Sequence, residues 1–204
     1  MIKEILNNIE QPIFRQYQKG EVIYRESESP QYLYIVEEGI IGLYYNSENG
    51  KESFLRVYGP GEIFGHRSYF LETPYHANSI SLTKSKLMLI DRKQCDNICL
   101  ESPALLKNMT KILARELGNA ERRLAGMADK SAKARIVEAL VYLKLKHPEH
   151  NWTRKEIADF AVSTFESVTR ILSELESAGL ITKSGRSIEI VDEQKLLKYS
   201  SENY

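Results

Sequence analysis

The sequence predicts an α+β protein with an all-β first half and a mainly helical second half. Short β-type runs extend from Tyr17 to about Ile90, and glycine-containing turns such as Asn49-Gly50 separate them. Strands of this length, joined by hairpin-type turns at near-regular spacing, argue for a sandwich or barrel. Near Pro103 the apolar residues change to helical spacing, so we expect a long helix after the β part.

The composition indicates a chain that folds around its own core. Of the 204 residues, 42% are hydrophobic and 27% are charged, as in ordinary globular proteins. The chain has no apolar run of the roughly 18 residues that span a bilayer, and its start is too polar for a signal peptide. We therefore expect a cytoplasmic protein without a membrane partner. The 28 basic and 28 acidic residues balance, so the overall charge indicates no polyanionic partner, although residues 130–188 are modestly basic.

One amphipathic helix of about six turns is predicted after Ser102 and Pro103, which suit the N-cap and the first turn. Its apolar positions recur at three- and four-residue steps and are Leu106, Met109, Leu113, Leu117, Ala120, Leu124 and Met127. This narrow stripe has two interpretations. Either the helix lies on the β part, or the stripe forms a coiled-coil seam with a second copy of the chain, because its spacing is heptad-like.

A pair of short helices is the sharpest signal in the second half, after a helix that Ser131 caps. Thr153 and Glu156 form a capping box for the first short helix. Thr164, with Ser167 nearby, caps the second one after a tight turn. Two short helices joined in this way form a helix-turn-helix, whose second helix fits the major groove of DNA.

The outward face of the second short helix carries side chains suited to base contacts, namely Phe165, Glu166, Thr169 and Arg170. An arginine binds guanine O6 and N7 as a fork, and a glutamate accepts a hydrogen bond from cytosine N4, so this face suits a G·C pair. The alternative is a surface ion pair between Glu166 and Arg170, worth about a few tenths of a kcal/mol.

A two-stranded wing is predicted after the second short helix. A strand follows Gly179, a turn covers residues 182–187, and a strand returns at 188–190. Lys183 and Arg186 are expected at the tip of this wing, where they suit contact with phosphate. Further contacts with the DNA backbone are expected near the starts of the two short helices, from Thr153, Arg154, Thr164 and Ser167.

Over nearly all of its length the chain resembles the family of the cyclic-AMP receptor protein and the fumarate and nitrate reduction regulator. The resemblance rests on the stretch from Lys19-Gly20-Glu21 to Gly39, the turn Gly61-Glu62-Ile63-Phe64-Gly65, the long helix and the winged helix-turn-helix. The pattern Glu166-x-x-Thr169-Arg170 is closer to the fumarate and nitrate branch. Phe165 stands where the cyclic-AMP branch has an arginine.

The resemblance implies three parts of the chain. Residues 1–103 would form a sensor domain of the cyclic-nucleotide-binding type, built as a double-stranded β-helix or jelly roll. Residues 104–130 would be a dimerisation helix and hinge, and residues 131–204 a winged helix-turn-helix DNA-binding domain. The implied function is transcription regulation by a homodimer that binds double-stranded DNA at an inverted repeat. RNA polymerase and a small-molecule effector would be further partners.

The sensor pocket that the resemblance implies involves Gly65, His66, Arg67, Ser68, His76 and Ala77. In the cyclic-AMP branch a glutamate follows the second glycine of the phosphate turn, and an Arg-Ser pair follows later. This chain has His66 and His76-Ala77 at those positions. A guanidinium fork matches phosphate oxygens and a neutral imidazole does not, so we expect an effector other than cyclic AMP. Arg67 offers a charge from a shifted position.

Cysteines and histidines constrain the other cofactors. The iron–sulfur branch needs an N-terminal cysteine cluster, and the first 94 residues contain no cysteine. Cys95 and Cys99 have no second pair to complete a metal site, so we expect buried thiols and no bound metal ion. Haem remains an alternative cofactor, because His66 and His76 can serve as axial ligands.

Two other classes of protein compete with a regulator. A cupin enzyme would need a H-x-H pair, and none of the histidines, which are His66, His76, His147 and His150, forms one. We therefore expect no enzymatic activity and no catalytic residues. The alternative function is a cyclic-nucleotide- or haem-binding sensor module that acts through protein partners. Such a module would have no helix-turn-helix, and residues 152–190 argue against it.

Overall fold

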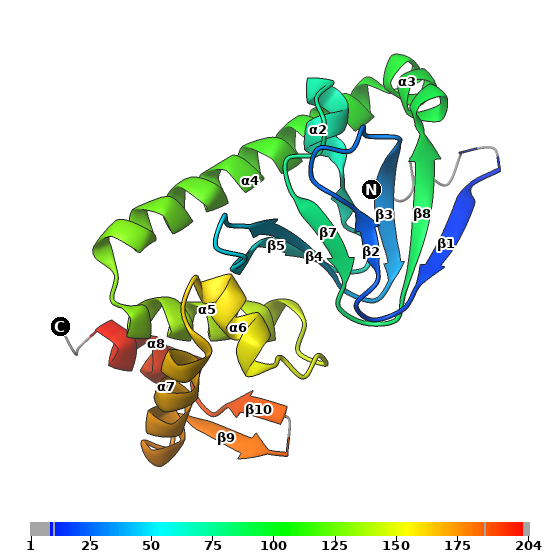
Figure 1. Ribbon diagram of the computed structural model, residues 1–204. Helices are drawn as coiled ribbons and strands as arrows, with labels where there is room; N and C mark the ends of the chain where they lie inside the picture. The colour runs from blue at the N-terminus through cyan, green and yellow to red at the C-terminus, as the bar shows by residue number, and fades with distance from the viewer. Residues whose placement is uncertain (1–8, 10, 186, 202–204) are drawn as a thin grey trace. The chain divides into compact units, whose positions relative to one another are not determined.

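The computed structural model describes residue 9, residues 11–185 and residues 187–201. Its first part is built from eight strands (Figure 1). They are β1 (Ile13–Tyr17), β2 (Val22–Tyr24), β3 (Tyr32–Glu38), β4 (Ile41–Asn46), β5 (Glu52–Tyr58), β6 (Ile63–Phe64), β7 (Asn78–Ser81) and β8 (Ser85–Asp91).

The eight strands form two four-stranded sheets, in the orders β1-β8-β3-β6 and β2-β7-β4-β5. The chain moves from one sheet to the other, so that β8 returns to lie between β1 and β3, antiparallel to both. This strand order is that of a jelly roll. It confirms the sensor fold expected from the sequence.

Alternation of side chains along β3 supplies two cores. Tyr34 and Val36 lie in the core between the two sheets, whereas Leu33 and Ile35 lie on the other face of the first sheet. The core between the sheets is rich in aromatic side chains, which are those of Tyr17, Tyr24, Tyr34, Tyr58, Phe64 and Tyr75.

Among the described residues, three helices cover the outer face of the first sheet: α2 (His66–Leu71), α3 (Arg92–Glu101) and the first turns of α4 (Pro103–Asp129). Cys95 of α3 is buried in this core, and burial raises the pKa of its thiol to about 12. The thiolate form is therefore scarce. Cys95 agrees with the expected buried thiols, whereas Cys99 is only partly buried.

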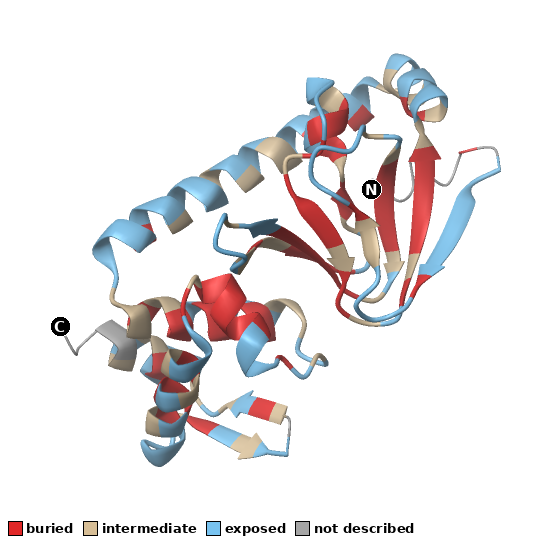
Figure 2. Cartoon of the chain, in the orientation of Figure 1, coloured by how far each residue is buried: buried red, intermediate tan, exposed pale blue. Residues whose placement is uncertain are grey.

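Helix α4 confirms the predicted long amphipathic helix. Leu105 and Met109, in its first turns, are buried in the sensor core. Leu117 and Leu124, farther along, are 60% and 70% exposed. This part of the helix is mostly pale blue in Figure 2. The first interpretation thus holds for the start of the helix, which lies on the β part, and the apolar stripe beyond it is uncovered.

The second part of the chain, as far as the structure describes it, packs four helices and one hairpin around its own core (Figure 1). Trp152 is buried there and its Nε1 donates to the carbonyl of Leu143 at 3.0 Å. The elements are α5 (Ala132–Lys146), α6 (Arg154–Ala161), α7 (Phe165–Ser177), β9 (Ile181–Ser184), β10 (Ser187–Ile190) and α8 (Glu193–Ser201).

The chain divides into two compact units. One comprises Met1–Lys51 and Leu55–Glu121, and the other comprises Glu52–Phe54 and Arg122–Tyr204, so the division falls within α4. Among the residues that the structure describes, no helix combines the length and the apolar character needed to cross a bilayer.

Candidate DNA-reading face and sensor pocket

The turn between α6 and α7 sets the geometry of the helix-turn-helix. Val162 ends α6 in the left-handed conformation, with φ 51° and ψ 51°. The N–H of Ser163 donates to the carbonyl of Ala158 at 2.9 Å. A β-branched residue seldom adopts this conformation, because its side chain crowds the backbone. The turn is therefore fixed by the packing of the two helices that it joins.

Both helix starts are capped as the sequence predicts. Thr153 Oγ1 accepts from the N–H of Glu156 at 3.2 Å, and the Glu156 carboxylate accepts from the N–H of Thr153 at 2.8 Å. Thr164 Oγ1 accepts from the N–H of Ser167 at 3.2 Å. These contacts fix where α6 and α7 begin, and so which residues of α7 face outward.

The four residues expected to read bases lie on the first two turns of α7. Phe165 is 51% exposed, Glu166 and Arg170 are exposed, and Thr169 is half-buried. Thr169 Oγ1 donates to the carbonyl of Phe165 at 2.8 Å, which leaves its oxygen as an acceptor. The opposite face of α7 is buried through Val168, Ile171, Leu172 and Leu175.

Arg170 forms an ion pair, but not the one considered from the sequence. Its Nη1 lies 2.6 Å from Oε1 of Glu174, one turn farther along the helix than Arg170, and Glu166 is not its partner. Because the Arg170 side chain is 66% exposed, we expect this pair to be worth about 0.5 kcal/mol or less. So weak a pair does not hold the Arg170 side chain in one position.

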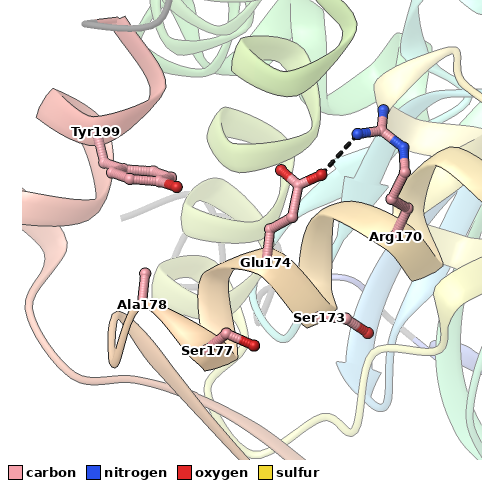
Figure 3. A pocket seen from close by; sticks show the side chains of 6 residues that line it. All are labelled: Arg170, Ser173, Glu174, Ser177, Ala178 and Tyr199. Carbon is pink, nitrogen blue, oxygen red and sulfur yellow. Dashed lines mark hydrogen bonds and ion pairs between the residues drawn. The ribbon is translucent and has the colours of Figure 1, made fainter.

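An open groove of about 590 Å³ lies beside this ion pair (Figure 3). Tyr199, from α8, faces Glu174 across the groove, and Lys133 Nζ lies 3.9 Å from the centre of the Tyr199 ring and 3.9 Å from Glu174 Oε2. The charged residues that line the groove are therefore the paired Arg170 and Glu174. The remaining lining residues are Ser173, Ser177 and Ala178.

The wing is the hairpin of β9 and β10. Its ladder continues to the residues that flank the turn, because Gly185 adopts a positive φ of 58° and closes the turn tightly. Lys183 consequently lies within β9, and the expectation that it stands at the tip is wrong. Arg186 lies outside the described residues.

Two ion pairs hold the wing in place. Lys183 Nζ lies 2.6 Å from Glu176 Oε2 of α7. Lys144 of α5 is buried, and its Nζ donates to the carbonyl of Pro148 and to Glu189 Oε1 of β10, both at 3.1 Å. These contacts fix the hairpin relative to α5 and α7. In the free chain they also partly neutralise Lys183.

The sensor pocket lies at the junction of β5, α2 and the loop before β7. Its lining residues are Tyr24, Leu43, Arg56, Tyr58, Gly65, His66, Arg67, Ser68, Tyr75 and His76. Five of the six expected pocket residues are therefore brought together. Ala77, the sixth, is fully buried in the aromatic core.

Aromatic side chains fill most of this pocket. Tyr24 and Tyr75 stack with ring centres 3.7 Å apart, and Phe64 stacks on Tyr34 and Tyr58 at 4.9 and 5.5 Å. The remaining cavity is about 10 Å³, which holds at most one water molecule. The residues present do not fit a haem group or a cyclic nucleotide in this arrangement.

Gly65 allows the close approach of α2 to β3. Its φ is +81°, and a Cβ at this position would lie 3.2 Å from Cδ2 of Tyr34. A side chain would therefore be strained by the backbone conformation and would also press on the aromatic core.

Sequence reasoning missed two polar groups of the pocket. Arg56 extends from β5, and Glu116 reaches the pocket from α4 and contacts Arg56 and His66. Glu116 stands between the apolar positions of the helix, so the spacing alone marks it as an ordinary surface residue. Arg56 is likewise one polar residue within a predicted strand.

His76 is half-buried and its pKa is lowered to about 4. Burial is the largest cause, and the positive charges of Arg67 and Arg56 add to it. Its imidazole is therefore uncharged at neutral pH. Among the described residues, no group of three or more histidine, cysteine or acidic side chains is arranged to hold a metal ion.

Comparisons with known proteins agree with this geometry in both halves of the chain. Residues 14–102 match the cyclic nucleotide-binding domain, and residues 134–199 match the Crp-like helix-turn-helix domain. The first match covers the jelly roll and α3. The second covers α5, the helix-turn-helix and the wing.

The relatives named below are distant but similar over most of their length. The "CRP-like cAMP-activated global transcriptional regulator" of Mycobacterium tuberculosis is 24% identical over 191 residues, which cover 89% of this chain and 85% of the relative. The "Cyclic AMP receptor protein" of Thermus thermophilus is 27% identical over 178 residues, covering 86% and 82%. The solved structure of FixK2 from Bradyrhizobium japonicum has the same fold, with a TM-score of 0.85 at 23% identity over 94% of this chain and 98% of that one.

The lowered pKa of His76 makes stability depend on pH. The unfolded chain takes up a proton near pH 6.5 and the folded chain only near pH 4, so folding loses stability as the pH falls from 6.5 to 4. His76→Asn lacks this proton uptake. We expect the wild-type melting temperature to fall more than that of the variant between pH 7.5 and pH 5. Parallel falls would contradict the assignment, because every other titrating group is shared.

Proposed function

The chain belongs to the CRP/FNR family of transcription regulators, and from this premise we propose that it binds an inverted-repeat DNA operator as a homodimer. The observation that carries the proposal is the outward face of α7. Phe165, Glu166 and Arg170 are exposed on a helix whose start is capped and whose other face is buried. This is the geometry in which a recognition helix enters the major groove.

We assign contacts with base edges and contacts with the DNA backbone to different residues. Glu166, Thr169 and Arg170, with Phe165 beside them, are proposed to read base edges. Thr153, Arg154, Thr164, Ser167 and Lys183 are proposed to contact the backbone, because they lie near the helix starts or on the wing. Lys183 must first leave Glu176, so its contribution is smaller than that of an unpaired lysine.

The uncovered part of α4 supports a homodimer. An isolated exposed leucine is common, but a row of exposed apolar residues along one helix indicates an interface. Pairing through this row would present two recognition helices about one DNA turn, roughly 34 Å, apart. Met109 is buried in the sensor core and does not belong to the row. The members of the row are Leu106, Leu117, Ala120, Leu124 and Met127, which are exposed, and Leu113, which is half-buried.

The sensor is proposed to respond to an effector other than cyclic AMP. The pocket has His76 and Ala77 where an Arg-Ser pair would bind a cyclic phosphate, and aromatic rings occupy its volume. We further propose that the protein acts in the cytoplasm, contacts RNA polymerase and has no enzymatic activity. These last inferences rest on likeness to regulators.

We expect cyclic AMP not to bind. Isothermal titration of the purified full chain should show no saturable heat up to millimolar cyclic AMP, because no guanidinium stands at the phosphate position and the cavity is filled. Binding in the micromolar range would contradict this inference. It would show that Arg56 or Arg67 replaces the missing arginine and that the aromatic rings move aside.

Leu117→Glu should convert the dimer to a monomer, because two buried carboxylates would face each other across the seam. Sedimentation velocity would measure the mass, and operator binding should weaken at least about tenfold when two half-sites are no longer held together. Lys111→Glu, at an exposed polar position of the same helix, is the matched control and should remain dimeric. A dimeric Leu117→Glu protein would exclude this seam.

Arg170→Ala should lose base discrimination. Selection of bound sites from random duplex DNA first gives the operator, which we expect to be an inverted repeat with a G·C pair in each half. The variant should bind this operator about 1–3 kcal/mol more weakly. It should also accept other base pairs in place of the G·C pair of each half-site. Lys183→Ala should weaken operator and random DNA alike. If Arg170→Ala lost the same affinity for the operator and for random DNA, Arg170 would not be a base-reading residue.

A further inference from the structure

The carboxylate of Glu116 contacts residues that line the sensor pocket, although its backbone belongs to α4. Oε2 lies 3.1 Å from His66 Nε2 and 3.3 Å from Arg56 Nη1, and the Tyr58 hydroxyl donates to Oε1 at 3.4 Å. An ionised carboxylate only accepts hydrogen bonds, so the contact with His66 requires a proton on Nε2. Three donors, from β5 and α2, thus meet one carboxylate.

These groups are withdrawn from water. The side chain of His66 is 2% exposed and that of Glu116 is 14% exposed. Burial alone would raise the pKa of Glu116, but the hydrogen bond from His66 and the charge of Arg56 outweigh it and lower this pKa. Glu116 is therefore a largely buried anion at neutral pH, and such an anion is stable only with partners arranged around it.

The donors are directed at the carboxylate, and two of them are buried. Tyr58 is 4% exposed, and His66 Nδ1 is buried without a hydrogen-bond partner among the described residues. The cavity beside them is about 10 Å³. The pocket is therefore complementary to one small anionic head group.

We propose that Arg56, Tyr58 and His66 form a carboxylate-binding site in the sensor pocket, and that Glu116 of the same chain is its resident ligand. The class of ligand that the site takes is a small monocarboxylate. The site belongs to the sensor of the proposed regulator, but it is formed within one unit of the chain and can be tested without DNA. Failure of the proposed DNA binding would leave it untouched.

Glu116→Ala in the full chain tests the site directly, because it removes the carboxylate and leaves the donors around a space suited to acetate. We expect a melting temperature a few degrees below that of the wild type. Acetate should restore most of this loss and reach saturation, because a ligand that binds only the folded state stabilises it. Sodium chloride at the same ionic strength should not restore the melting temperature.

Two further variants separate the site from general effects of salt. Glu121→Ala removes an exposed carboxylate from the same helix, and it should melt like the wild type and show no response to acetate beyond that to chloride. Arg56→Gln combined with Glu116→Ala should lose the response to acetate. Equal acetate shifts in all four proteins, or a Glu116→Ala protein that melts like the wild type, would overturn the proposal.

Glu116→Gln keeps the shape of the side chain. It provides a second test of the site if the alanine variant does not fold. It should melt below the wild type at neutral pH. The difference should vanish as the pH falls below about 4.5, because Glu116 has a lowered pKa and its contribution is lost as it is protonated. The groups that face it, Arg56, Tyr58, His66 and nearby His76, are shared by both proteins. A difference that does not change with pH would overturn the proposal.

Discussion

The apolar surface of α4 is the constraint on which the rest of the molecule depends. Leu105 and Met109 anchor the start of the helix in the sensor core, and the same helix then extends beyond the jelly roll with Leu117 and Leu124 exposed. These exposed leucines can be removed from water only by packing against another apolar surface. Because α5 follows after a short connection, the partner helix that covers the stretch in the proposed homodimer would also set the separation of the two DNA-reading units.

The features that the sequence predicts correctly are those encoded by residues a few positions apart. A capping box needs only Thr153 and Glu156, and the apolar stripe of α4 needs only a three- and four-residue repeat. Strand and turn spacing was enough to predict a sandwich or barrel. The family likeness then added the jelly-roll order, in which β8 lies between β1 and β3, because no local pattern specifies that order.

The interior of the sensor pocket could not be predicted in the same way. Tyr24 and Tyr75 read as ordinary strand or loop residues, and their stacking depends on which sheets face each other. Glu116 meets Arg56 and His66 from a distant segment, so no spacing rule connects them. Lys183 was misplaced for a related reason, because the end of a hairpin ladder depends on the φ angle of Gly185.

Val162 shows that the helix-turn-helix is not a portable unit. A glycine at this position would adopt the left-handed conformation by its own preference, whereas valine adopts it only because the helices on either side are already packed. The angle between α6 and α7 is thus a property of the whole winged domain. Grafted onto another scaffold without α5 and the wing, residues 153–177 would keep their helical propensity but lose the crossing angle that presents Arg170.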